Sequence, residues 1–164
     1  HIHLDPRNIA KIAVALGERM TQLDPADADG YRARTRGFLD RWQQAIARWE
    51  QASAALKGMP LIVYHKNMSY LIGWLGMKEL GALEPKPGLP PTASHLSELL
   101  AQLQRNPAKA IVLAAYNDPR GGDWLSDHAK IRVLILPFTV GGNDKAKDLF
   151  GLFDDSIAQL LAVK

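Results

Sequence analysis

Histidines and acids at the ends of apolar runs are the residues of this sequence with the clearest capacity for chemistry. His65, Glu84 and Asp118 each stand at the end of, or just after, a short run rich in Val, Ile and Leu. Imidazole and carboxylate groups together are typical ligands of zinc and other borderline divalent cations. If the runs are parallel strands, these side chains meet at the carboxyl edge of a sheet, where open α/β folds bind ligands. The alternative is that they only cap helices and loops.

A second histidine pair stands at the start of the chain. His1 and His3 are two residues apart, so in an extended segment their side chains point the same way and could face one site. The alternatives are a purification-tag remnant or a frayed terminus. His95 and His128 are predicted to be solvated surface residues.

The first 58 residues must position the N-terminal pair, and their pattern is helical. Asp5 followed by Pro6 is typical of a helix start. Apolar residues then recur with helical spacing until Leu-Asp-Pro ends the pattern: Ile9, Ile12, Leu16, Met20 and Leu23. A second helix is predicted over Gly30–Lys57, about 42 Å long at 1.5 Å per residue. That length exceeds the width of a small domain.

From residue 59 onward, predicted strands alternate with predicted helices. The strands are Leu61–His65, Leu80–Leu83, Ala110–Tyr116 and Arg132–Phe138. The helices are Ser69–Leu75, His95–Leu103, Asp123–His128 and Asp144–Val163, the last capped by Asn143 or Asp144. Continuous apolar strands are typical of a sheet that is covered on both faces. We therefore predict an α/β fold with a four-stranded parallel sheet flanked by helices, preceded by a helix and a long spine helix.

Composition excludes several classes of protein and function. The 164 residues are 47% hydrophobic and 23% charged, which is ordinary for a globular chain and unlike a disordered one. The net charge of +3 is spread evenly, so a nucleic-acid partner is not expected. The absence of cysteine removes thiol chemistry and Cys-zinc sites. The longest apolar run is too short for a transmembrane helix, and no dinucleotide, P-loop or Ser-elbow motif is present.

The order of the segments resembles a known family. Residues 1–6 (HIHLDP), followed by a helix ending in Leu-Asp-Pro and a long helix, resemble the zinc/manganese-binding solute-binding proteins of bacterial ABC transporters, a family that includes adhesin-like lipoproteins. Residues 63–71 (VYHKNMSYL) match the strand–His–helix segment of that family. Residues 84–88 (EPKPG), leading into residues 91–96 (PTASHL), also match it.

The resemblance implies a division of the chain. Family members have two α/β lobes joined by a spine helix, with the metal ion in the cleft between them. By this resemblance, residues 1–29 are the remnant of the N-terminal lobe, residues 30–58 are the spine helix, and residues 59–164 are the C-terminal α/β lobe. A signal peptide and most of the first lobe are then expected to be missing from this sequence.

The resemblance also implies metal ligands. His1 is similar to the ligand of the family's His-x-aromatic-Leu-Asp-Pro motif, and His65 is similar to the second-lobe ligand. That ligand is His in zinc members and often Glu in manganese members, so Zn²⁺ is favoured over Mn²⁺. His3 stands where an aromatic residue is usual, so His1 and His3 could exchange roles. The family often has an acidic ligand after the last strand, where this chain has residues 136–138 (LPF). The fourth position stays open between water, Asp118, Glu84 and nothing.

The sequence thus predicts a non-enzymatic periplasmic receptor that binds zinc and hands the ion to an ABC permease in the inner membrane. Two other functions stay open. One is a small α/β enzyme or receiver-like domain that uses strand-end acids such as Asp118. The other is a module that dimerises through the long helix. Because the apolar stripe of the first helix lacks an evident partner, a homodimer of this chain is also predicted.

Overall fold

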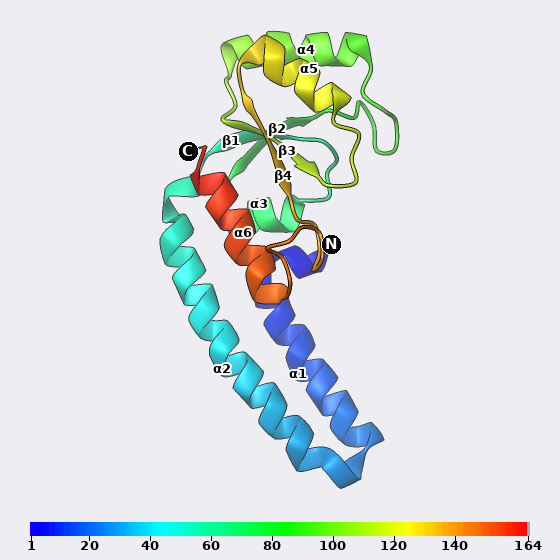
Figure 1. Ribbon diagram of the computed structural model, residues 1–164, viewed down its shortest axis with the longest axis vertical. Coiled ribbons are helices and arrows are strands. Elements are labelled where there is room, and N and C mark those ends of the chain that lie inside the picture. The colour runs from blue at the N-terminus through cyan, green and yellow to red at the C-terminus, as the bar shows by residue number, and fades with distance from the viewer. Residues whose placement is uncertain (164) are drawn as a thin grey trace.

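The computed structural model describes residues 1–163, in which a helical hairpin projects from a layered α/β unit (Figure 1). A 3₁₀ turn, Ile2–Leu4, precedes α1 (Pro6–Leu23), and a second turn, Pro25–Asp27, leads into α2 (Ala28–Ser53). The predicted short helix and long spine helix are therefore confirmed, although the spine ends as a 3₁₀ turn, Ala54–Leu56. Among the described residues, no helix is both long and apolar enough to cross a membrane.

The α/β unit contains the predicted four-stranded sheet. Its strands are β1 (Pro60–Val63), β2 (Lys78–Ala82), β3 (Ala110–Ala114) and β4 (Arg132–Leu136). All pairings are parallel and the order is β2-β1-β3-β4. The helices between and after them are α3 (Ser69–Trp74), α4 (Ala93–Arg105), α5 (Arg120–Ala129) and α6 (Leu149–Leu161). The predicted alternation of strands and helices from residue 59 onward is therefore confirmed.

Helices cover both faces of the sheet, as the continuous apolar strands predicted (Figure 1). Helices α4 and α5 pack on one face, where Ile62 and Ile111 meet Leu99 and Leu125. Helices α3 and α6, with the base of the hairpin, pack on the other face. The five residues of β3 are all buried because this central strand is paired on both edges and covered on both faces.

Most predicted boundaries differ from the observed ones by a few residues, and two of these errors have a clear local reason. Strand β3 ends at Ala114 instead of Tyr116, because the Asn117 side chain accepts the Ala114 N–H at 2.8 Å and turns the chain. The last helix begins at Leu149, where Asp148 accepts the Gly151 N–H at 2.8 Å. Neither Asn143 nor Asp144 caps it. The side-chain oxygen of Asn143 instead accepts the backbone N–H groups of Lys145 and Ala146, in the loop before the helix.

Candidate metal centre

The strand order places a topological switch point between β1 and β3, because the chain winds outward from this pair in both directions. Ligands of open α/β sheets bind outside the carboxyl ends of the strands at such a point. His65 follows β1 at this edge, and its side chain is 35% exposed. The imidazole is therefore accessible at the position where the fold favours a ligand.

His65 and Glu84 form a direct pair, as their strand-end positions predicted. The His65 Nδ1 lies 2.5 Å from the Glu84 Oε2, and the same oxygen accepts the Gly88 N–H at 3.1 Å. The Glu84 side chain is only 12% exposed. Burial alone would raise the pKa of Glu84, but the bonds from His65 and Gly88 hold that pKa below its usual value. The parallel pairing of β1 and β2 brings the two residues together.

His1 and His3 lie around Phe138, just beyond the end of β4. Residues 2–4 form a 3₁₀ turn, so the extended segment in which His1 and His3 would point the same way is not present. The two rings still lie near each other, with centroids 6.4 Å apart, and each meets the Phe138 ring edge to face. The His3 Nε2 donates to the Phe138 carbonyl at 2.9 Å, which leaves Nδ1 as its unprotonated nitrogen when His3 is neutral.

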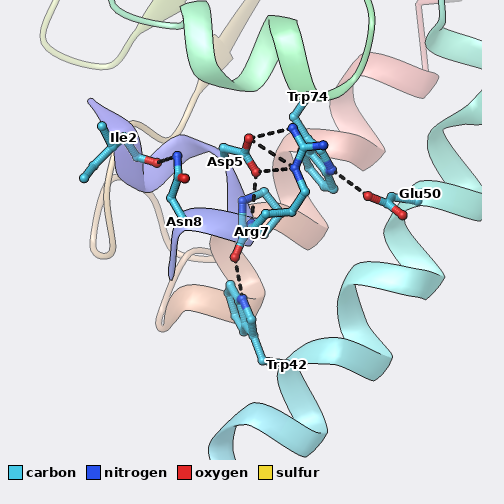
Figure 2. A network of polar contacts seen from close by, with 8 residues as sticks. Ile2, Asp5, Arg7, Asn8, Trp42, Glu50 and Trp74 are labelled. Atoms are coloured by element: carbon cyan, nitrogen blue, oxygen red, sulfur yellow. Dashed lines mark hydrogen bonds and ion pairs between the residues drawn. The ribbon is translucent and has the colours of Figure 1, made fainter. Parts of the chain in front are cut away.

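The residues that follow the two histidines fix their position. Leu4 is 1% exposed, and Asp5 caps α1 by accepting the Arg7 N–H at 2.9 Å. The Arg7 guanidinium also bonds both Asp5 oxygens, so the pKa of Asp5 falls below its usual value although burial opposes this. From α2, the buried Trp42 donates its indole N–H to the Pro6 carbonyl at 2.8 Å (Figure 2). Residues 4–6 (LDP) thus anchor the turn that carries His1 and His3 to α2.

Three residues that the sequence analysis did not single out connect the two histidine groups. Asn67, 4% exposed, donates to the Tyr116 hydroxyl at 2.7 Å, and the Tyr116 ring meets Phe138 at a centroid distance of 5.6 Å. This chain of contacts runs from the loop of His65 to the ring against which His1 and His3 pack. The sequence did carry a signal for this contact, since Tyr116 and Phe138 are the aromatic last residues of two predicted strands.

Asp118 is at the same edge of the sheet but faces a different hollow. It makes a forked ion pair with Arg120, and the bonds from the Arg120 side chain and N–H lower the pKa of Asp118 to about 2. It lines a pocket with Tyr64 and Trp124, whereas His65 and Glu84 line a smaller one with residues 85–87. The structure therefore pairs His65 with Glu84 and leaves Asp118 outside that pair.

The candidate ligands lie in two separate pairs, His65 with Glu84 and His1 with His3. Across residues 1–163, no three His, Asp or Glu side chains form a group that could hold a metal ion. The carboxyl edge of the sheet therefore carries one accessible histidine after β1 and a second near the end of β4. His65 is held by a carboxylate, and His1 lies beside a His3 that already donates to a carbonyl. Such histidines are suited to bind a borderline cation together with ligands from elsewhere.

Comparison with known proteins identifies the family of this chain. The family model described as "ZnuA: Zinc-uptake complex component A periplasmic" matches residues 1–163. The chain belongs to this family. The resemblance inferred from the motifs to zinc- and manganese-binding solute-binding proteins of ABC transporters is therefore confirmed. A curated ZnuA-family relative, the high-affinity zinc uptake system protein ZnuA of Yersinia pestis, is 25% identical over 111 residues. That alignment covers 68% of this chain and 35% of the relative.

Solved structures show the same fold for this member of the ZnuA family. The manganese complex of the solute-binding protein FpvC of Pseudomonas aeruginosa has a TM-score of 0.81 at 17% identity, covering 99% of this chain and 62% of that one. A Zn(II)-bound variant of AdcAII of Streptococcus pneumoniae has a TM-score of 0.77 at 18% identity, covering 98% and 59%. The chain thus spans about three-fifths of the length of these structures.

Proposed function

We propose that this chain is part of a periplasmic receptor that binds zinc for an ABC-type importer and delivers the ion to a permease in the inner membrane. The metal ion is cargo in this role, and no catalytic step is proposed. The proposal keeps the division made from the sequence: residues 1–29 belong with a first lobe, residues 30–58 form the spine and residues 59–164 form the second lobe.

The accessible imidazole of His65 is the observation that carries the proposal. It stands at the switch point of the sheet with Nδ1 bonded to a carboxylate, so its Nε2 is left to bind a cation. Because the ring is already held by a carboxylate, His65 loses little further conformational freedom when the metal ion binds. That preorganisation favours a specific site over adventitious binding by a mobile side chain.

The proposed ligand set begins with His65 and His1. His1 is preferred over His3 because the Nε2 of His3 is already committed to the Phe138 carbonyl. Asp118 is the weakest candidate, since Arg120 occupies both of its oxygens. A carrier must also release its ion, so a site completed by water or by other residues is compatible with this role.

Zinc is the proposed cargo, with manganese as the second choice. Neutral imidazole nitrogen suits zinc better than manganese, which prefers carboxylate, carbonyl and water oxygen. Both proposed ligands, His65 and His1, are histidines. If the cargo were manganese, replacing His65 by Glu would preserve or improve binding, whereas zinc affinity should fall.

Calorimetric titration with zinc tests the proposal, using protein purified without a histidine tag. His65→Ala should lose more affinity than the roughly 10–100-fold typical when only a partner of a ligand is removed. His128→Ala is the matched control because this exposed imidazole lies on α5 and stacks on Trp124. Equal zinc binding by the wild type and His65→Ala would exclude His65 as a ligand.

We also propose that two copies of this chain associate through the hairpin. Residues of α1 and α2 line an apolar groove of about 390 Å³: Ile9, Ile12, Leu16, Met20, Tyr31 and Phe38 are among them. Helix α1 is about 27 Å long, and two adjacent helices are about 20 Å wide, so one face offers about 500 Å² per copy. Two such faces in a two-fold contact reach the roughly 1,000 Å² that a specific interface requires.

A further inference from the structure

The bond between His65 and Glu84 decides which nitrogen of the imidazole is free. A neutral imidazole has one N–H donor and one acceptor nitrogen. Glu84 Oε2 already accepts the Gly88 N–H, so it meets His65 Nδ1 as an acceptor at 2.5 Å. The proton of neutral His65 therefore lies on Nδ1, and the lone pair lies on Nε2.

Glu84 is itself held in place by several independent contacts. Its backbone N–H donates to the Tyr64 carbonyl at 3.2 Å, which continues the pairing of β2 with β1. Prolines at positions 85 and 87 restrict the loop that follows. Gly88, with φ of 83°, turns the chain back so that its N–H reaches the carboxylate. The loop at residues 84–88 is therefore built around this side chain.

His65 and Glu84 differ in how accessible their side chains are to solvent, and this difference indicates different roles. The His65 side chain is 35% exposed and that of Glu84 is 12% exposed, so an ion arriving from solvent meets the imidazole more readily. The oxygen that faces His65 already has two donors. A carboxylate that bonds the far nitrogen of a metal-ligating histidine fixes its ring orientation and tautomer and raises its basicity.

We propose that Glu84 is the positioning residue for His65, holding its Nε2 ready for the metal ion, and is not itself a ligand. This inference rests on the proposed zinc-binding function. It gives the strand, the histidine and the proline-containing loop of this chain one shared task, which is to present a single imidazole nitrogen in a fixed direction.

Nitrogen NMR of ¹⁵N-labelled, metal-free protein tests the positioning directly. At a pH where His65 is neutral, the wild type should show the Nδ1–H tautomer. In Glu84→Ala the ring should shift toward the Nε2–H form that free histidine favours in water. Glu84→Gln should retain much of the Nδ1–H tautomer, because the amide oxygen still accepts a hydrogen bond. An unchanged tautomer in a folded Glu84→Ala protein would overturn the proposal.

Zinc titration of the same variants separates positioning from ligation. We expect Glu84→Ala to lose about 10–100-fold in zinc affinity and Glu84→Gln to lose clearly less. If Glu84 were a ligand, Gln would lose as much as Ala, because a neutral amide is a poor zinc ligand. Glu79→Ala is the matched control: this acid lies on β2 and pairs with Lys66 at 3.7 Å, not with His65.

The two measurements also keep this inference apart from the function on which it depends. Failure of the wild type to bind zinc would overturn the receptor function. In that case a tautomer shift in Glu84→Ala would show that the error lies in the function. No tautomer shift, combined with zinc binding that depends on His65, would show that only the role of Glu84 is wrong.

Discussion

Apolar side chains are mostly buried in the α/β unit but largely exposed to solvent in the outer part of the hairpin. In the sheet, Leu61, Ile62 and Val63 of β1 are each 0% exposed. In α1, Leu16 is 59% exposed and Leu23 is 64% exposed, although they belong to an equally regular apolar stripe. Periodicity therefore shows which face of a helix is apolar, but the burial of that face depends on whether another element lies over it.

The transition from buried to exposed apolar side chains occurs at the base of the hairpin. Trp42 and Trp49 of α2 pack against Phe150 and Phe153 of α6, with ring centroids 4.9–6.3 Å apart. Beyond this aromatic cluster α1 and α2 contact mainly each other, and Figure 1 shows them projecting away from the sheet. The candidate metal centre is thus attached to the well-packed end of the molecule, where preorganised ligands are held most rigidly.

Removing Trp42 should have the largest effect, because this ring joins the two regions. Its side chain is 0% exposed, and Trp42→Ala deletes a large buried ring together with the bond to Pro6. We expect the free energy of unfolding to fall by about 3–5 kcal/mol in urea denaturation. Trp42→Phe keeps a six-membered ring but removes the indole N–H that donates to the Pro6 carbonyl, and it should cost about 1–3 kcal/mol. A cost for Trp42→Ala no greater than that of Leu16→Ala would contradict the comparison.

A smaller and pH-dependent effect is expected inside the α/β unit at Asp155. This buried carboxylate of α6 bonds Asn143 and Gln159 at 2.7 Å each, and Lys145 Nζ lies 3.5 Å away. Burial alone would raise its pKa, but these bonds and the lysine charge bring the pKa below the usual value of 3.8. The charged form is thus favoured in the folded state. Its contribution is present above pH 3.8 and is lost as the pH falls through the lower folded pKa.

Asp155→Asn should therefore destabilise the protein at neutral pH by about 1–3 kcal/mol. The difference in stability between the variant and the wild type should narrow in thermal unfolding as the pH is lowered below 3.8, because the unfolded wild type then binds a proton that the folded carboxylate resists. Asp144→Asn serves as the control, since Asp144 is exposed and makes no side-chain hydrogen bond or ion pair within residues 1–163. A difference that stays the same as the pH is lowered would show that the charge of Asp155 does not matter.

The smallest effect on stability is expected at the outer hairpin. Leu16→Asp should change the free energy of unfolding by no more than about 0.5 kcal/mol, because Leu16 is mostly exposed in the single chain. The same substitution should abolish the proposed dimer, since it places a charge in the apolar groove. Light scattering at tens of micromolar measures the mass of both proteins. Ala15→Asp adds an equal charge at a neighbouring exposed position outside the groove. A monomer mass for the wild type would exclude the dimer.

Local chemistry in the sequence determined much of the fold. Asp5 and Pro6 start α1 because a capping carboxylate and a residue without an N–H suit the first turn of a helix. The continuous apolar runs of β1 and β3 predicted buried parallel strands, and the order of helices and strands followed from the change of period near residue 59. These features depend on residues close together in the chain, which is why the sequence could specify them.

Only the tertiary structure decided how the candidate site is assembled. The pairing of β1 with β2 puts Glu84 against His65, whereas the loop after β3 turns Asp118 toward Arg120. The bond of His3 to Phe138 joins residues 135 positions apart. Strand ends can be located from an apolar pattern, but side-chain directions in the loops that follow have no fixed period. Which hydrogen-bond partner each side chain meets therefore depends on how distant segments pack.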